Sequence, residues 1–177
     1  MPFLIIIIAF LQMNTQVIYD FTKADKLNGW FIVNDDVMGG RSTCSFAIDE
    51  NGNAVFKGQV SLENYGGFSS VHYRFDPVST DGFRFIMLRV KGDGKRYQVR
   101  IKNQASDYYS YIAYFETTGE WQNVKVNLNK MYPSFRGRKL DMPDFEGGKI
   151  EELTLLIGNK KEEDFRIEID KIQLLKE

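Results

Sequence analysis

The chain has few of the residues that define several common protein classes. Its 177 residues include a single cysteine, Cys44, which cannot form an intrachain disulfide, and a single histidine, His72, which excludes multi-histidine metal centres. Lysine and arginine number 23 and aspartate and glutamate 24, so the chain lacks the positive charge expected of a dedicated nucleic-acid-binding protein. Its longest apolar run, residues 3–11, is far shorter than the roughly 20 residues of a transmembrane helix. The composition therefore predicts no nucleic-acid partner and no membrane span.

The apolar run at residues 3–11 has two interpretations. As the apolar region of a signal peptide, it assigns residues 1–16 to a removed segment and predicts an exported or periplasmic protein, although no basic residue precedes it. As a buried first strand, it predicts a cytoplasmic or membrane-peripheral protein. Removal is favoured, because an uncharged isoleucine-rich strand is an aggregation hazard unless it is fully covered. We expect residues 17–177 to form a single β-sandwich domain.

Short alternating segments separated by Gly, Asn and Asp predict an all-β fold. Residues 97–102 alternate strictly, which predicts a strand with its apolar odd-numbered residues buried and its polar even-numbered residues facing solvent. Residues 165–170 repeat this pattern before the apolar phase shifts, as it does across a β-bulge. Numerous strands with few helical signals favour a two-sheet jelly-roll sandwich. Residues 129–149, which contain two prolines, are expected to form a long surface loop.

The most unusual segment places two carboxylates, an amide and a Gly-Gly pair between two expected strands. Its candidate residues are Asn34, Asp35, Asp36, Gly39, Gly40, Arg41 and Ser42. One interpretation is a ligand loop whose oxygens bind calcium or sugar hydroxyls, with glycines that allow close backbone approach. The other is a turn whose side chains bond their own backbone, which is favoured because the EF-hand spacing is absent. No cofactor is assigned, and a structural calcium ion is unsupported.

A second Gly-Gly segment precedes an aromatic strand. Its candidate residues are Tyr65, Gly66, Gly67 and Phe68. No dinucleotide-binding or Walker spacing is present and no helix follows, so a glycine bulge at a strand start is favoured over a phosphate site. His72 follows shortly afterwards and is expected to face solvent, because no nucleophile motif accompanies it.

Taken together and in order, several segments resemble one known family. They are Trp30 with residues 34–42, Phe56-Lys57-Gly58, residues 65–70, Trp121 and Phe135-Arg136-Gly137. They resemble the complex I intermediate-associated protein family over about residues 17–175, and the Asn-Asp-Asp-Val-Met form of the first motif resembles its bacterial branch. The resemblance implies a galactose-binding-like jelly roll. It also implies a non-catalytic role, because the best-known member is an assembly chaperone for NADH:ubiquinone oxidoreductase.

Three functions remain open at this point. The first is a non-enzymatic module that holds a partner protein, such as an assembly intermediate of a membrane complex, through loops at one end of the sandwich. Its expected anchors are Arg41, Arg74 and Arg136, with Asp35 and Asp36 giving charge complementarity. The second is a carbohydrate-binding module of the galactose-binding-like type, and the third is a hydrolase that uses Asp35 or Asp36 as acid or base. We favour the first, assign no catalytic or metal-ligating residue, and complete the candidate set with Trp121 and Gly137.

Overall fold

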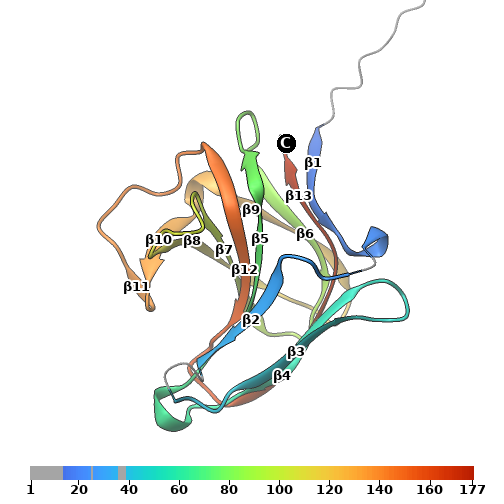
Figure 1. Cartoon of the computed structure of the whole chain (residues 1–177), viewed down its shortest axis with the longest axis vertical. Coiled ribbons are helices and arrows are strands. Elements are labelled where there is room, and N and C mark those ends of the chain that lie inside the picture. Colours follow the sequence, from blue (N-terminus) through green and yellow to red (C-terminus); the bar gives the residue numbers. More distant parts are fainter. Residues whose placement is uncertain (1–13, 25, 36–38) are drawn as a thin grey trace, which may run out of the picture.

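The computed structural model describes residues 14–24, 26–35 and 39–177. Two antiparallel β-sheets face one another (Figure 1). The apolar run at residues 3–11 lies outside the described residues. Within the part of the chain that is described, no helix is long and apolar enough to cross a membrane.

The first sheet has six strands in the order β3-β4-β13-β6-β9, with β1 paired to β13. These strands are β1 (Thr15–Asp20), β3 (Thr43–Ile48), β4 (Ala54–Val60), β6 (Phe85–Lys91), β9 (Trp121–Asn127) and β13 (Glu163–Leu175). The register between β13 and β6 shifts between Ile169 and Lys171. This irregularity confirms the β-bulge that the apolar phase shift predicted.

The second sheet has seven strands in the order β11-β10-β8-β7-β12-β5-β2. They are β2 (Trp30–Asn34), β5 (Ser69–Ser79), β7 (Arg96–Lys102), β8 (Ser110–Glu116), β10 (Tyr132–Phe135), β11 (Arg138–Lys139) and β12 (Lys149–Ile157). In β7, Tyr97, Val99 and Ile101 are fully buried, as the alternation predicted. The even-numbered residues of β7 therefore lie on the opposite face of this sheet.

The expectation of an irregular loop over residues 129–149 was wrong in its first half. A short 3-10 helix, η4 (Leu128–Lys130), leads into β10, which pairs with β8 and forms a hairpin with β11. Pro133 is accommodated in this strand near the sheet edge, where its missing N–H is tolerated. Two further 3-10 helices, η1 (Phe21–Lys23) and η3 (Glu63–Tyr65), occupy connections between strands.

The core lies between the two sheets and consists of alternate residues from most strands. From the first sheet it takes Phe56, Leu88 and Ile167, and from the second it takes Val99 and Leu155, all fully buried. Each such side chain contributes about 1.5–3 kcal/mol through burial. This antiparallel two-sheet sandwich confirms the predicted all-β class and leaves the outer face of each sheet to carry polar residues.

Candidate functional site

The carboxylate of Asp35 joins the two Gly-Gly segments. Asp35 follows β2, is only 1% exposed, and accepts hydrogen bonds from the backbone N–H and the hydroxyl of Ser42, at 3.0 and 2.5 Å. Its Oδ2 also accepts from the backbone N–H groups of Gly67 and Phe68, at 2.6 and 3.3 Å. We call these four residues the Asp35 clamp. It explains why two segments about thirty residues apart share one site.

Two of the glycines are needed because the Asp35 side chain occupies the space beside them. A Cβ built on Gly40 would lie 2.3 Å from Asp35 Oδ1, and one built on Gly66 would lie 2.6 Å from Oδ2. Gly39 and Gly67 instead have positive φ angles, of 88° and 139°. Each Gly-Gly pair therefore supplies one residue that makes room for the carboxylate and one that turns the chain.

The surroundings of Asp35 keep its carboxylate ionised. Burial alone would raise the pKa of Asp35, but the hydrogen bonds from Ser42, Gly67 and Phe68 outweigh it and hold this pKa below its usual value. Because both oxygens already accept hydrogen bonds, this carboxylate has little capacity left to bind a metal or act as a base. Within the described ranges, no three His, Cys, Asp or Glu side chains gather closely enough to hold a metal ion.

The residues around the clamp are exposed. Arg41 forms an ion pair with Glu63 at 2.9 Å, and both side chains are more than half exposed. Tyr65 is 99% exposed, and Leu62, three residues earlier, is also exposed. In Figure 1 the short η3 segment, found by its blue-green colour, lies near the end of β2. We call the surface formed by Arg41, Leu62, Glu63 and Tyr65 the loop-end surface.

The other candidate residues lie elsewhere, and Asp36 lies outside the described residues. Asn34 ends β2 and accepts a hydrogen bond from Cys44 Sγ at 3.1 Å. Trp121 begins β9, where Arg89 lies over its ring at 5.6 Å. Arg136 and Gly137 form the β10–β11 turn with positive φ angles, at the edge of the seven-stranded sheet opposite β2. The structure therefore unites the two Gly-Gly segments but separates them from Arg136.

Arg74 belongs to a charged cluster on the outer face of the seven-stranded sheet. Glu152 on β12 is 1% exposed and accepts from Arg74 Nε at 2.6 Å, with Lys102 Nζ 3.8 Å away. The Nδ1 atom of His72 lies 3.0 Å from Glu152 Oε1. Burial would raise the pKa of Glu152, but the bonds from His72 and Arg74 and the charge of Lys102 lower it overall. We call Glu152, His72, Arg74 and Lys102 the Glu152 cluster.

The sequence interpretation missed this cluster. His72 was expected to face solvent, but its side chain is mostly covered, and its Nε2 lies 3.0 Å from the hydroxyl of Ser70. Glu152 was not singled out because it is 80 residues away in sequence and carries no motif. One pattern in the sequence could have indicated the cluster. Basic residues occupy several outward-facing positions in the segments around residues 72 and 100. The strand order that makes these segments neighbours of β12 was not accessible from the sequence.

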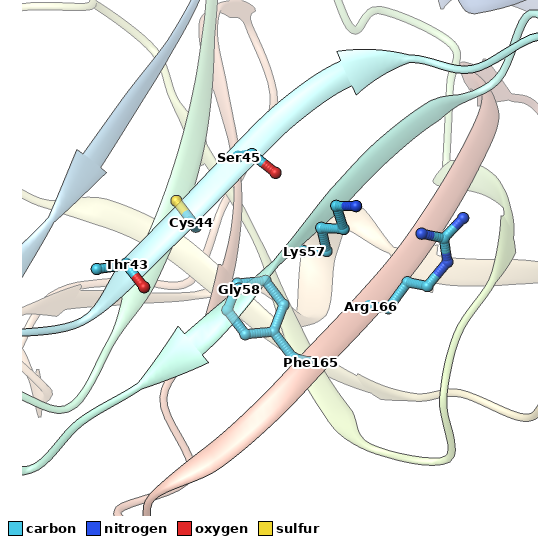
Figure 2. Close-up of a pocket in the computed structure, with 7 residues that line it drawn as sticks. All are labelled: Thr43, Cys44, Ser45, Lys57, Gly58, Phe165 and Arg166. Carbon is cyan, nitrogen blue, oxygen red and sulfur yellow. The ribbon is translucent and has the colours of Figure 1, made fainter.

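Two shallow hollows lie on the six-stranded sheet. One, of about 400 Å³, is lined by Thr43, Ser45, Lys57, Gly58 and Arg166, together with Cys44 and Phe165 (Figure 2). It lies where Gly58 has no side chain and the backbone of Cys44 on β3 approaches closely. The other, of about 280 Å³, includes Trp121. Neither contains residues of the two Gly-Gly segments.

Solved structures define the class of this sandwich. It is similar to the family 11 carbohydrate-binding module from Clostridium thermocellum, with a TM-score of 0.64, 13% identity, and coverage of 91% of this chain and 95% of the module. It is also similar to a family 29 carbohydrate-binding module, with a TM-score of 0.53, 14% identity, and coverage of 92% of this chain and 85% of the module. At these identities the likeness concerns the fold alone, which is the jelly-roll type found in carbohydrate-binding modules.

Sequence comparison identifies the family. The model of the complex I intermediate-associated protein 30 (CIA30) family matches residues 19–169, so the chain belongs to this family. Its relatives include the mitochondrial complex I intermediate-associated protein 30 of Mus musculus, 26% identical over 89% of this chain and 55% of the relative. The Drosophila melanogaster protein of the same name is 25% identical over 76% of this chain and 53% of the relative. The chain spans about half the length of these curated relatives.

Proposed function

We propose that this chain is a non-catalytic binding module that holds a partner protein through its loop-end surface. The observation that carries this proposal is Tyr65, which is 99% exposed, in a segment where Leu62 is exposed as well. Exposed aromatic and arginine side chains are the commonest anchors of protein interfaces. The loop-end surface offers both, since Arg41 lies on it.

The backbone under Tyr65 supports a binding role. Asn64 and Tyr65 have φ angles of 52° and 62°, a left-handed conformation that costs free energy in residues other than glycine. Gly67, two residues after Tyr65, donates its backbone N–H to the buried Asp35 carboxylate. A loop that already has its bound backbone conformation loses less backbone entropy when it binds, which favours affinity.

Family membership supports the choice of partner. The relatives are named for association with complex I intermediates, so we propose an assembly intermediate of NADH:ubiquinone oxidoreductase as the partner. The hydrolase alternative receives no support from Asp35, whose carboxylate is buried and bonded at both oxygens. The assignment to a bacterial branch remains a prediction from the form of the first motif.

The proposal is tested by affinity recovery of the tagged protein from its native cells after crosslinking. Wild type is compared with Tyr65→Ala and with Tyr108→Ala, a control that removes an equally large exposed side chain elsewhere on the surface. We expect the partner to be lost with Tyr65→Ala and retained with Tyr108→Ala, while thermal unfolding stays unchanged in both. Equal recovery by all three proteins would refute the loop-end surface as the interface.

Carbohydrate binding is a second candidate. It is favoured by Tyr114, an exposed aromatic residue on the polar outer face of the seven-stranded sheet, beside Gln98. An aromatic ring offers an apolar face on which a sugar ring can stack, and an amide can both donate to and accept from sugar hydroxyls. A glycan array probed with and without calcium tests this function, and the absence of any saturable ligand would count against it.

A further inference from the structure

The outer face of the seven-stranded sheet carries a continuous band of polar and aromatic side chains. The strand registers place Phe31, His72, Thr154, Arg100, Ile112 and Tyr132 opposite one another in a row across β2, β5, β12, β7, β8 and β10. A neighbouring row contains Arg74, Glu152 and Lys102, and the row on the other side contains Ser70, Leu156, Gln98 and Tyr114. We call these three rows the sheet band.

Positive charge exceeds negative charge in the sheet band. Arg74, Arg100 and Lys102 carry fixed positive charges, and Glu152 is the carboxylate that faces them among these residues. The Glu152 carboxylate is already engaged by Arg74 at 2.6 Å and lies 3.8 Å from Lys102. The band is therefore cationic, although the whole chain has a net charge of −1.

Arg100, near the centre of the sheet band, has only a neutral partner in the part of the chain that is described. Its Nε and Nη2 atoms donate to the side-chain oxygen of Gln98, at 2.9 and 2.6 Å. Burial lowers the pKa of Arg100, and the nearby Tyr114 and Tyr132 oppose this effect. A guanidinium that is partly desolvated without a carboxylate partner binds an incoming anion more strongly than an exposed one does.

The aromatic rings of the sheet band already carry cationic groups. The Arg74 guanidinium lies 4.8 Å from the Phe31 ring centre, Arg96 lies 4.5 Å from Tyr114, and Lys139 lies 5.3 Å from Tyr132. Neutral sugars need bare ring faces for stacking, whereas cations held over rings are placed to meet anions. The arrangement therefore favours an anionic ligand over a neutral glycan.

We propose that the sheet band binds an acidic segment of the partner protein, with a carboxylate of that segment paired to Arg100. This inference rests on the proposed function, which makes the partner a protein. Arg74 and Lys102, which flank Glu152 in the neighbouring row, would receive further carboxylates. A guanidinium fork binds a carboxylate through two parallel hydrogen bonds, which a lysine cannot reproduce.

The direct test uses a short labelled peptide of alternating glutamate and serine, whose carboxylates share one side when extended. Its binding is measured by fluorescence anisotropy, beside a peptide with glutamine in place of glutamate. We expect saturable binding of the glutamate peptide only, weakened about 30-fold or more by Arg100→Gln, because loss of one member of a desolvated charge pair costs at least that much affinity. Arg166→Gln, the same change on the outer face of the other sheet, should leave binding unchanged.

Two further variants keep the test decisive if Arg100→Gln does not fold. Arg100→Lys retains the charge without the fork and should give an intermediate loss, while Lys102→Gln should give a smaller one. Equal binding by wild type and these variants would overturn the proposal. So would binding of neutral glucan oligomers in place of the glutamate peptide, which would instead support the carbohydrate candidate.

Recovery from native cells separates this proposal from the proposed function. If wild type recovers a protein partner and Arg100→Gln recovers it equally well, the sheet band is refuted while the proposed function stands. If wild type recovers no protein partner, the proposed function fails. Loss of the partner with Arg100→Gln but not with Arg166→Gln supports the sheet band as part of the interface.

Discussion

Replacing Asp35 by asparagine should strongly destabilise the fold, although the change is nearly isosteric. The wild-type carboxylate accepts from two groups of Ser42 and from the amides of Gly67 and Phe68. Asparagine has one accepting oxygen, and its NH₂ group must face N–H donors wherever it is placed. With the NH₂ group at the Oδ2 position, the amides of Gly67 and Phe68 lose their acceptor.

The expected cost follows from the number of donors left without a partner. Each buried unsatisfied donor costs about 1–3 kcal/mol. Two such donors give a loss of about 4 kcal/mol. For a chain of this length, each kcal/mol lowers Tm by about 2–4 °C, so we expect Tm to fall by about 8–16 °C.

Thermal and urea unfolding followed by circular dichroism measure this effect. Asp164→Asn is the matched control, because Asp164 is exposed on β13 and should change stability by no more than about 0.5 kcal/mol. A loss below about 1 kcal/mol for Asp35→Asn, with the control unchanged, would show that the clamp does not hold the two segments together.

The pH dependence gives a second test of the same residue. The pKa of Asp35 is lowered in the folded protein, so its stabilising contribution is complete above its unfolded pKa of about 3.9 and is lost as pH falls through the folded value. The stability difference between wild type and Asp35→Asn should therefore be constant near neutral pH and shrink below about pH 4. A difference that stays constant at lower pH would contradict the lowered pKa.

Two other substitutions test the space around the clamp and the charge on the sheet. Gly40→Ala should destabilise by about 1–3 kcal/mol, because its Cβ would lie 2.3 Å from Asp35 Oδ1, whereas Gly119→Ala, with nothing within 4 Å, should be nearly neutral in urea unfolding. Glu152→Gln should cost about 3 kcal/mol, since it leaves the surrounding cations without their buried carboxylate, and the exposed control Glu120→Gln should cost less than about 0.5 kcal/mol. If Gly40→Ala is as stable as Gly119→Ala, the space beside Gly40 is not filled by Asp35. If Glu152→Gln is as stable as Glu120→Gln, the Glu152 carboxylate does not stabilise the cations around it.

The strands were predictable because their signals are local. Alternation over residues 97–102 placed Tyr97 and its neighbours in the core, and the apolar phase shift near Ile172 indicated the bulge in β13. Each of these signals depends on side chains within a few residues of one another. The β10–β11 hairpin was missed for the opposite reason, since Pro133 and the glycines that follow suggested an irregular loop.

The candidate site was only partly predictable, because its contacts join distant segments. Both Gly-Gly segments were identified from composition, but the Asp35 carboxylate that unites them acts over 32 residues to Gly67. The Glu152 cluster depends on β12 pairing with both β5 and β7, a strand order that no local pattern shows. Arg100 was assigned to an ordinary solvent-facing position for the same reason.

Site-specific photo-crosslinking in the native cells tests the central claim most directly. A photoreactive phenylalanine analogue replaces Tyr65 in one variant and Tyr108 in the other, since both side chains are exposed on different parts of the surface. The account predicts covalent adducts with subunits of NADH:ubiquinone oxidoreductase from position 65 and few or none from position 108. Adducts that are equally abundant from both positions, or no protein adduct from position 65, would contradict the claim that this chain holds a protein partner through its loop-end surface.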